Sequence, residues 1–181
     1  MYDYKRFRSW CGEDVRIDDH VQITRPQLVD IGDHIAIDFG FYCSTQLKIG
    51  DYVHISPHVS VVGGEAGLLE IDCFITISSG SRLVCGGETF SGEGLVGPFI
   101  PPQYRDKLKV APIRLRRFSG IASNVVVFAG CDIAEGSVVG AGSVLTGSTE
   151  PWTIYAGVPA RPIKTRRSDA MKAYAKKMGY A

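Results

Sequence analysis

Residues 115–145 read LRRFSGIASNVVVFAGCDIAEGSVVGAGSVL, and an apolar residue recurs in them at every sixth position. No helix has this period, because an α-helix repeats about every 3.6 residues. The recurring residues are Leu115, Ile121, Val127, Ile133, Val139 and Leu145. This recurrence of an apolar residue at every sixth position is here called the beat. It occurs earlier in interrupted runs, namely Ile17, Ile23 and Val29, then Ile31 and Ile37, then Ile49, Ile55 and Val61, and lastly Ile71, Ile77 and Leu83.

The residues around each beat position complete a hexapeptide repeat. The residue after the beat is usually small or acidic, and the fourth after it is often small or β-branched. Each six-residue unit is then a short strand and a turn, and three units form one triangular coil with the apolar beat inside. The pattern predicts an all-β parallel β-helix of about six coils. A sandwich or barrel would explain the alternation in VHISPHVSVV, residues 53–62, but not a six-residue beat held in phase.

The length of 181 residues predicts one domain. We divide the chain into an N-terminal segment at 1–14, the β-helix at 15–165 and a short C-terminal helix within 166–181. A small insertion at 63–68 and a long inserted loop at 86–112 interrupt the coils. The long loop holds too many apolar and aromatic residues for a free linker, so we expect it to dock on another surface, such as that of a neighbouring subunit.

Charge and cysteine content exclude several classes of protein. The 20 basic and 19 acidic residues give a net charge of +1, which provides no global field to attract nucleic acid. The five cysteines show no paired spacing, which fits a reduced, cytoplasmic protein. The N-terminus lacks the order of a signal peptide, and no apolar run is long enough to span a membrane. The basic C-terminus is either a solvated helix face or a contact for an anionic partner.

The stretch IASNVVVFAGCDIAEGSVVGAGSVLTGSTEPWTIYAGVPARPIKTR, residues 121–166, resembles the end of the hexapeptide-repeat acyltransferases, which include sugar and nucleotide-sugar acetyltransferases. The resemblance implies a left-handed winding and an acetyl-CoA or other acyl-CoA co-substrate. It also implies a sugar or nucleotide-sugar acceptor, and a homotrimer with active sites between subunits. The long insert looks like that of a subgroup associated with lipopolysaccharide and other surface polysaccharides.

The resemblance also assigns a coenzyme A site near the end of the β-helix. Coenzyme A carries phosphates that favour a cation, and a pantetheine arm that suits a straight row of backbone amides. Arg161 is the expected phosphate contact, whereas Ala141 and Thr146 are coil corners whatever else they do. The residues carried over are Ser123, Ala141, Thr146 and Arg161, with Pro159 and Lys164 close by.

The catalytic base departs from the family pattern. In galactoside-type members a histidine occupies the place of Glu88, and all four histidines of this chain precede the long loop. Either Glu88 or His58 is then the base, with Asn124 as a third candidate that orients a carbonyl or an acceptor. A carboxylate is a poor base for a hydroxyl unless burial raises its pKa, whereas an amine attacks unaided. This favours an amino sugar and leaves O- versus N-acylation open.

Two other functions remain possible at this point. A non-catalytic hexapeptide subunit would use its coils only for assembly, and a β-helix carbonic anhydrase would bind zinc through histidines such as His34, His54 and His58. Their spacing does not favour a zinc site, so we expect no metal.

Overall fold

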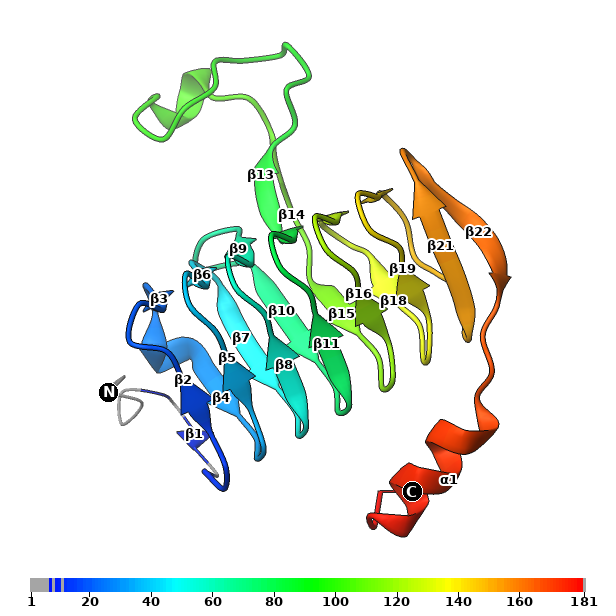
Figure 1. Cartoon of the computed structure of the whole chain (residues 1–181). Coiled ribbons are helices and arrows are strands. Elements are labelled where there is room, and N and C mark those ends of the chain that lie inside the picture. Colours follow the sequence, from blue (N-terminus) through cyan, green and yellow to red (C-terminus); the bar gives the residue numbers. More distant parts are fainter. Residues whose placement is uncertain (1–6, 8, 11, 181) are drawn as a thin grey trace.

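The computed structural model describes residues 7, 9–10 and 12–180, and it is a left-handed parallel β-helix with three flat faces (Figure 1). The strands of one face are hydrogen-bonded in parallel to those of the coils before and after. The six-residue beat therefore predicted the fold correctly, and the left-handed winding expected from the resemblance is confirmed.

Each face is a stack of short strands. The first face contains β1 (Ser9–Trp10), β4 (Val29–Ile31), β7 (Gln46–Ile49), β10 (Leu68–Ile71), β15 (Ile113–Leu115) and β18 (Asp132–Ile133). The second contains β2 (Arg16–Ile17), β5 (Ala36–Ile37), β8 (Val53–Ile55), β11 (Ile75–Ile77), β16 (Gly120–Ile121), β19 (Val138–Val139) and β21 (Thr153–Gly157). The third contains β3 (Gln22–Ile23), β6 (Tyr42–Cys43), β9 (Ser60–Val62), β12 (Arg82–Val84), β17 (Val126–Phe128) and β20 (Val144–Leu145).

These strands form six complete coils, and β21 begins one more. The last strand, β22 (Ala160–Thr165), turns back and pairs antiparallel with β21. A short 3-10 helix, η2 (Pro26–Leu28), lies between the first two coils.

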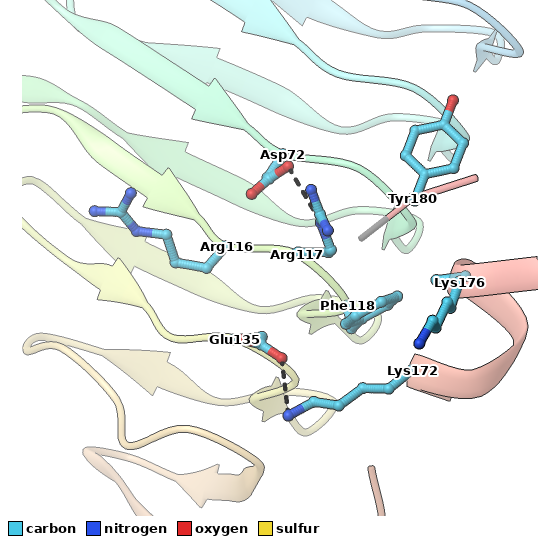
Figure 2. Close-up of a pocket in the computed structure, with 9 residues that line it drawn as sticks. Asp72, Arg116, Arg117, Phe118, Glu135, Lys172, Lys176 and Tyr180 are labelled. Atoms are coloured by element: carbon cyan, nitrogen blue, oxygen red, sulfur yellow. Dashed lines mark ion pairs between the residues drawn. The ribbon is translucent and has the colours of Figure 1, made fainter. Parts of the chain in front are cut away.

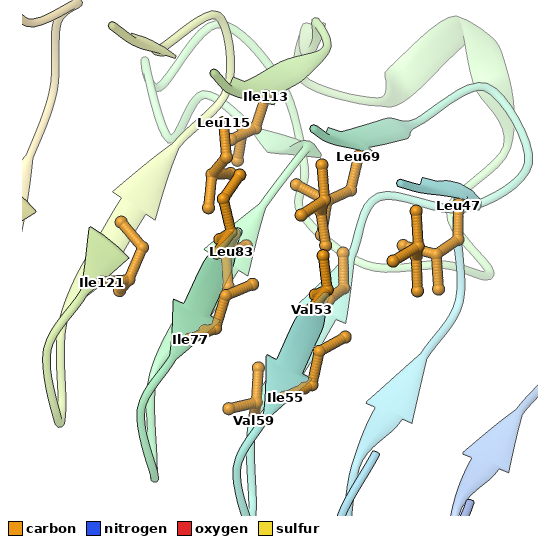
Figure 3. Close-up of a cluster of buried hydrophobic side chains, with 14 of the residues drawn as sticks. Leu47, Val53, Ile55, Val59, Leu69, Ile77, Leu83, Ile113, Leu115 and Ile121 are labelled. Atoms are coloured by element: carbon orange, nitrogen blue, oxygen red, sulfur yellow. The ribbon is translucent and has the colours of Figure 1, made fainter. Parts of the chain in front are cut away.

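The interior of the prism is the apolar beat. All the beat residues named from the sequence are buried, and Val127, Ile133 and Val139 have no exposed surface. Leucine, isoleucine and valine side chains from successive coils stack along the axis (Figure 3). Burying a side chain of this kind stabilises the fold by about 1.5–3 kcal/mol, so the core is a sum of similar layers.

The three edges of the prism differ in sequence. The aromatic edge joins the first face to the second and carries His34, Tyr52, Phe74, Phe118 and Trp152, all with positive φ. The glycine edge joins the second face to the third and carries Gly40, Gly80 and Gly142, together with His58 and Asn124. The arm edge joins the third face to the first.

Residues 86–112, here called the arm, leave the prism at the arm edge (Figure 1). Strand β13 (Gly86–Glu88) pairs antiparallel with β14 (Leu108–Val110) to form a stem, and η3 (Pro102–Tyr104) lies beyond it. The buried Asp106 carboxylate accepts hydrogen bonds from Ser91 Oγ at 2.7 Å and from the Lys107 amide at 2.7 Å. These bonds, that from Ser91 first, lower the pKa of Asp106. The arm is therefore an ordered element.

The tip of the arm is apolar and exposed. Phe99 is 98% exposed and Phe90 is 73% exposed, with Leu95 and Tyr104 also largely in solvent. Exposed aromatic side chains on an ordered element are typical of a surface that contacts another protein.

The C-terminal helix predicted from the sequence is α1 (Asp169–Lys177). It lies at the aromatic edge, on the side of the prism away from the arm (Figure 1). Ser168 precedes the helix, and its side chain makes no capping hydrogen bond. No helix in the described part of the chain has the length and apolar character needed to cross a bilayer.

Candidate functional site

Four of the six predicted coenzyme A residues lie along the glycine edge. Ser123 follows β16 and Ala141 follows β19, so both occupy the turn into the third face. Strand β21 reaches the same edge at Gly157, whose amide donates to Ser143 Oγ at 3.0 Å. Pro159 is in the turn that follows, and Arg161 pairs with Ala156 as β22 begins its return.

Arg161 is the cation of this edge. Its side chain is exposed, and its Nη1 donates to the neighbouring Ala160 carbonyl at 3.1 Å. No carboxylate in the described ranges pairs with it. Its positive charge is therefore available to a phosphate, which a planar guanidinium binds through two parallel hydrogen bonds.

The glycine edge alternates small and larger residues at positive φ. His58 (φ 59°) lies over Gly40, and Asn124 (φ 57°) lies over Gly80. A Cβ at either glycine would overlap the side chain above it, so both glycines are required by packing as well as by φ. The same left-handed φ recurs at the corners of the aromatic edge, so at His58 and Asn124 it is a feature of the coil corner.

His58 and Asn124 thus lie on one edge, two coils apart, with Gly80 between them. The His58 ring is exposed and meets Phe39 edge-on at 5.1 Å between centroids. The structure therefore brings two catalytic candidates and four cofactor candidates to the same edge.

Two predicted cofactor residues lie elsewhere. Thr146 follows β20 and so stands at the arm edge, across the third face from Ala141. Lys164 pairs with Ile154 at the far end of the β21–β22 hairpin, next to the aromatic edge. Within one chain, neither is grouped with Arg161.

Glu88 is also at the arm edge, at the end of the arm's stem. Its Oε1 accepts a hydrogen bond from the Gly97 amide at 3.0 Å, and the residue is half-buried. The carboxylate therefore helps to shape the arm. Glu88 and His58, the two candidate bases, lie at opposite edges of the third face in a single chain.

The other histidines pair with aspartates. His54 Nε2 lies 2.7 Å from Asp38 Oδ2, and His34 Nδ1 lies 3.1 Å from Asp14 Oδ2. His34 is on the aromatic edge, His54 on the second face and His58 on the glycine edge. In the part of the chain that the structure covers, no group of three His, Cys, Asp or Glu side chains could hold a metal ion. The geometry therefore does not support the carbonic anhydrase alternative.

Curated relatives of the chain are acyltransferases. The dTDP-4-amino-4,6-dideoxy-D-glucose acyltransferase of Escherichia coli is 28% identical over 163 residues, which are 88% of this chain and 83% of that protein. The putative lipopolysaccharide biosynthesis O-acetyl transferase WbbJ of Escherichia coli K12 is 34% identical over 68% of this chain and 59% of WbbJ. No protein-family model matches the chain.

Solved structures extend this similarity over nearly the whole chain. AntD, an N-acyltransferase from Bacillus cereus solved with dTDP and coenzyme A, is 34% identical with a TM-score of 0.89, over 96% of this chain and 91% of AntD. The acetyltransferase VCA0836 of Vibrio cholerae, at 20% identity and a TM-score of 0.59, shares the fold. The combination of the β-helix with these relatives means that the chain is an acyltransferase that belongs to the hexapeptide-repeat family, in its sugar and nucleotide-sugar branch.

Proposed function

We propose that this protein transfers an acyl group from acyl-CoA to the amino group of a dTDP-linked amino sugar, in sites shared between the subunits of a cytoplasmic homotrimer. The observation that carries the proposal is the division of the candidate residues between two edges. Arg161, Ser123 and His58 are on the glycine edge, whereas Glu88 and Thr146 are on the arm edge. A single chain cannot bring residues of both edges into one site.

A cyclic assembly would bring the two edges together. In a head-to-tail ring, the arm edge of one subunit meets the glycine edge of the next, and every site is then equivalent. The exposed Phe90 and Phe99 of the arm supply apolar surface for that contact. Three copies close such a ring, and the family resemblance favours this number.

The donor end of the site follows from the positions on the glycine edge. The edge runs straight along the coils past Ser123 and Ala141 to Arg161. A pantetheine arm laid along it could bond to backbone groups. The phosphates of coenzyme A would then meet the guanidinium of Arg161, which forms no ion pair with a carboxylate of the described residues. Lys164 takes a more remote role in this arrangement, because it lies at the other end of β22.

The acceptor end requires a group that removes a proton. His58 has an exposed ring, and Glu88 arrives from the neighbour's arm with one oxygen already bonded to the Gly97 amide. Asn124, which lies on the glycine edge beside Ser123, would orient the thioester carbonyl or the acceptor. An amine needs only a group that collects the proton released after attack, which suits a carboxylate.

The relatives support the choice of acceptor. AntD was also solved with dTDP-4-amino-4,6-dideoxyglucose and with 3-hydroxybutyryl-CoA. The E. coli relative is named for the same amino sugar. The free thiols of Cys43, Cys73, Cys85 and Cys131 suit the reducing cytoplasm, where acyl-CoA is available.

The test is to measure thiol release from acetyl-CoA and 3-hydroxybutyryl-CoA with a panel of acceptors. We expect turnover with dTDP-4-amino-4,6-dideoxyglucose, a product heavier by one acyl group, and no turnover with dTDP-glucose, which has only hydroxyls. The second candidate function is O-acetylation, which the similarity to WbbJ supports. Turnover with hydroxyl acceptors alone would establish that function instead and contradict the amine acceptor.

A further inference from the structure

The glycine edge continues past His58 towards the first coil, away from the acyl donor. His20 lies in the first coil, Phe39 in the second and His58 in the third, each in the turn from the second face to the third. Hydrogen-bonded strands of neighbouring coils are about 4.8 Å apart, so these three rings follow one another along the edge. The donor positions from Ser123 to Arg161 occupy the later coils, which leaves the earlier ones to the acceptor.

Phe39 is an exposed apolar residue in this row. It is 47% exposed, whereas Phe41, two positions later in the same turn, is 1% exposed and belongs to the core. The prism therefore does not need the Phe39 ring for its packing. A single exposed apolar side chain is common on protein surfaces, so the neighbours of this ring decide its role.

Both neighbours of Phe39 along the edge are imidazoles that hold its ring in place. The His20 ring lies 5.3 Å from it and the His58 ring 5.1 Å, measured between centroids, and both are in the edge arrangement that aromatic rings favour. His20 is itself fixed, because its amide donates to Asp18 Oδ1 at 2.8 Å and its Nδ1 is 3.1 Å from the same oxygen. Phe39 is therefore an ordered apolar surface between two polar rings.

Phe39 and the candidate base His58 form one unit. The His58 amide donates to the Phe39 carbonyl at 3.0 Å. Gly40 follows Phe39 directly, and a Cβ at Gly40 would lie 2.5 Å from His58 Nδ1. The His58 ring therefore rests on the turn that carries Phe39, and a molecule bound against His58 has the phenyl ring within reach.

The acceptor sugar has an apolar group next to its reacting amine. In a 4-amino-4,6-dideoxy sugar the nitrogen is on C4, and the bonded neighbour C5 carries C6 as a methyl group. An amine placed at His58 therefore brings that methyl group close to Phe39. A methyl group gains from burial against a phenyl ring, whereas a hydroxyl there loses water without gaining a partner from that ring.

The cavity beside α1 does not offer a second place for the sugar. It has a volume of about 640 Å³ and lies at the aromatic edge (Figure 2). Phe118, in its wall, precedes β16, whereas Ser123 follows that strand, so the two are on opposite edges of the second face. A sugar bound in the cavity could not reach a thioester on the glycine edge.

We propose that Phe39 is a specificity-determining residue of the acceptor site, where its ring contacts the 6-methyl group of a 6-deoxy amino sugar. The inference rests on the proposed function, because it places the acceptor amine at His58. It adds the reason why this site prefers a 6-deoxy sugar to the same sugar with a 6-hydroxyl.

The experiment is calorimetric titration of the intact protein, saturated with coenzyme A, with two acceptors in separate arms. One is dTDP-4-amino-4,6-dideoxyglucose, and the other is dTDP-4-amino-4-deoxyglucose, which differs only in its 6-hydroxyl. We expect the 6-deoxy acceptor to bind about tenfold to a hundredfold more tightly. Phe39→Ala should lower this ratio below about threefold, mainly by weakening the 6-deoxy acceptor, and Phe39→Leu, which keeps an apolar side chain, should retain most of it.

Tyr174→Ala is the matched control. It also removes an exposed aromatic ring, but from α1 at the aromatic edge, so it should leave both affinities unchanged. The ratio of the two affinities is the informative quantity, because a general loosening of the glycine edge in Phe39→Ala would weaken both acceptors alike.

Equal affinity of the unaltered protein for the two acceptors would overturn the inference, as would a ratio that survives in Phe39→Ala. Failure of the proposed function gives a different result, namely no thiol release from acyl-CoA with either acceptor. The ratio is measured by binding, so it can be read whether or not product forms. Binding of neither acceptor would overturn both the inference and the proposed function.

Discussion

Arg161 and Lys164 carry the same charge on the same strand, yet they stand at opposite ends of it. Arg161 is at the glycine edge with Ser123 and Ala141, whereas Lys164 is beside the aromatic edge. If the phosphates of the acyl donor lie at the glycine edge, Arg161 contributes more than Lys164 to acyl-CoA binding, and the reason is position alone.

We therefore expect Arg161→Gln to weaken acyl-CoA binding about tenfold to a hundredfold, the value of one or two charge-assisted hydrogen bonds. Lys164→Gln should change it by less than about twofold, because an exposed charge at that distance is screened. Calorimetric titration with coenzyme A measures both. Equal losses in the two variants would show that the phosphates do not lie where we place them.

The sequence could not separate these two residues. Up to β21, position within the eighteen-residue period assigns each residue to a face or an edge. The β21–β22 hairpin ends that rule, because β22 runs back across the same face without advancing a coil. Ser123 and Ala141 could thus be placed together from the period alone, but Lys164 could not.

At the aromatic edge, the contact between two rings depends on a single glycine, Gly136. Phe118 and Trp152 belong to the fifth coil and the start of the seventh, and their rings approach to 5.8 Å across the sixth coil. Gly136 is the corner residue between them, and it has no side chain to keep the rings apart. A Cβ at Gly136 would overlap the Trp152 ring.

Gly136→Ala should lower the free energy of unfolding by about 2–5 kcal/mol, combining the left-handed backbone of an alanine with overpacking against Trp152. Gly142→Ala is the matched control, since it has the same φ on the same coil but open space around it. It should cost only about 1–2 kcal/mol. Chemical denaturation measures both, and equal costs would mean that Trp152 moves aside freely.

The arm lies outside the repeat, so only part of its structure could be predicted from the sequence. Its apolar and aromatic content predicted that it docks on another surface, and in the single chain Phe90 and Phe99 lie in solvent. The internal order of the arm could not be predicted, because Asp106 acts through contacts that follow no period. For the same reason, the bond between Glu88 and Gly97 was not foreseen when Glu88 was considered only as a base.

For the whole molecule, the candidate residues lie on two opposite edges of the third face, and in our proposal each edge is half of an active site. The beat predicted the core because each apolar residue occupies the same environment in every coil. It could not reveal the half-sites, since a repeat specifies neighbours within a chain and carries no information on which edge meets another chain. We propose that an arm edge and a glycine edge from different subunits complete each active site.

The most direct test of this claim is the activity of mixed assemblies. One chain carries Glu88→Gln in the arm, and the other carries His58→Asn and Arg161→Gln on the glycine edge; each should be inactive alone. Co-expressed in equal amounts and purified through two different tags, they should regain about a third of the normal acyl-transfer rate, because one site in three joins two intact edges in every trimer that contains both chains. Mixed assemblies no more active than the separate variants would contradict the claim.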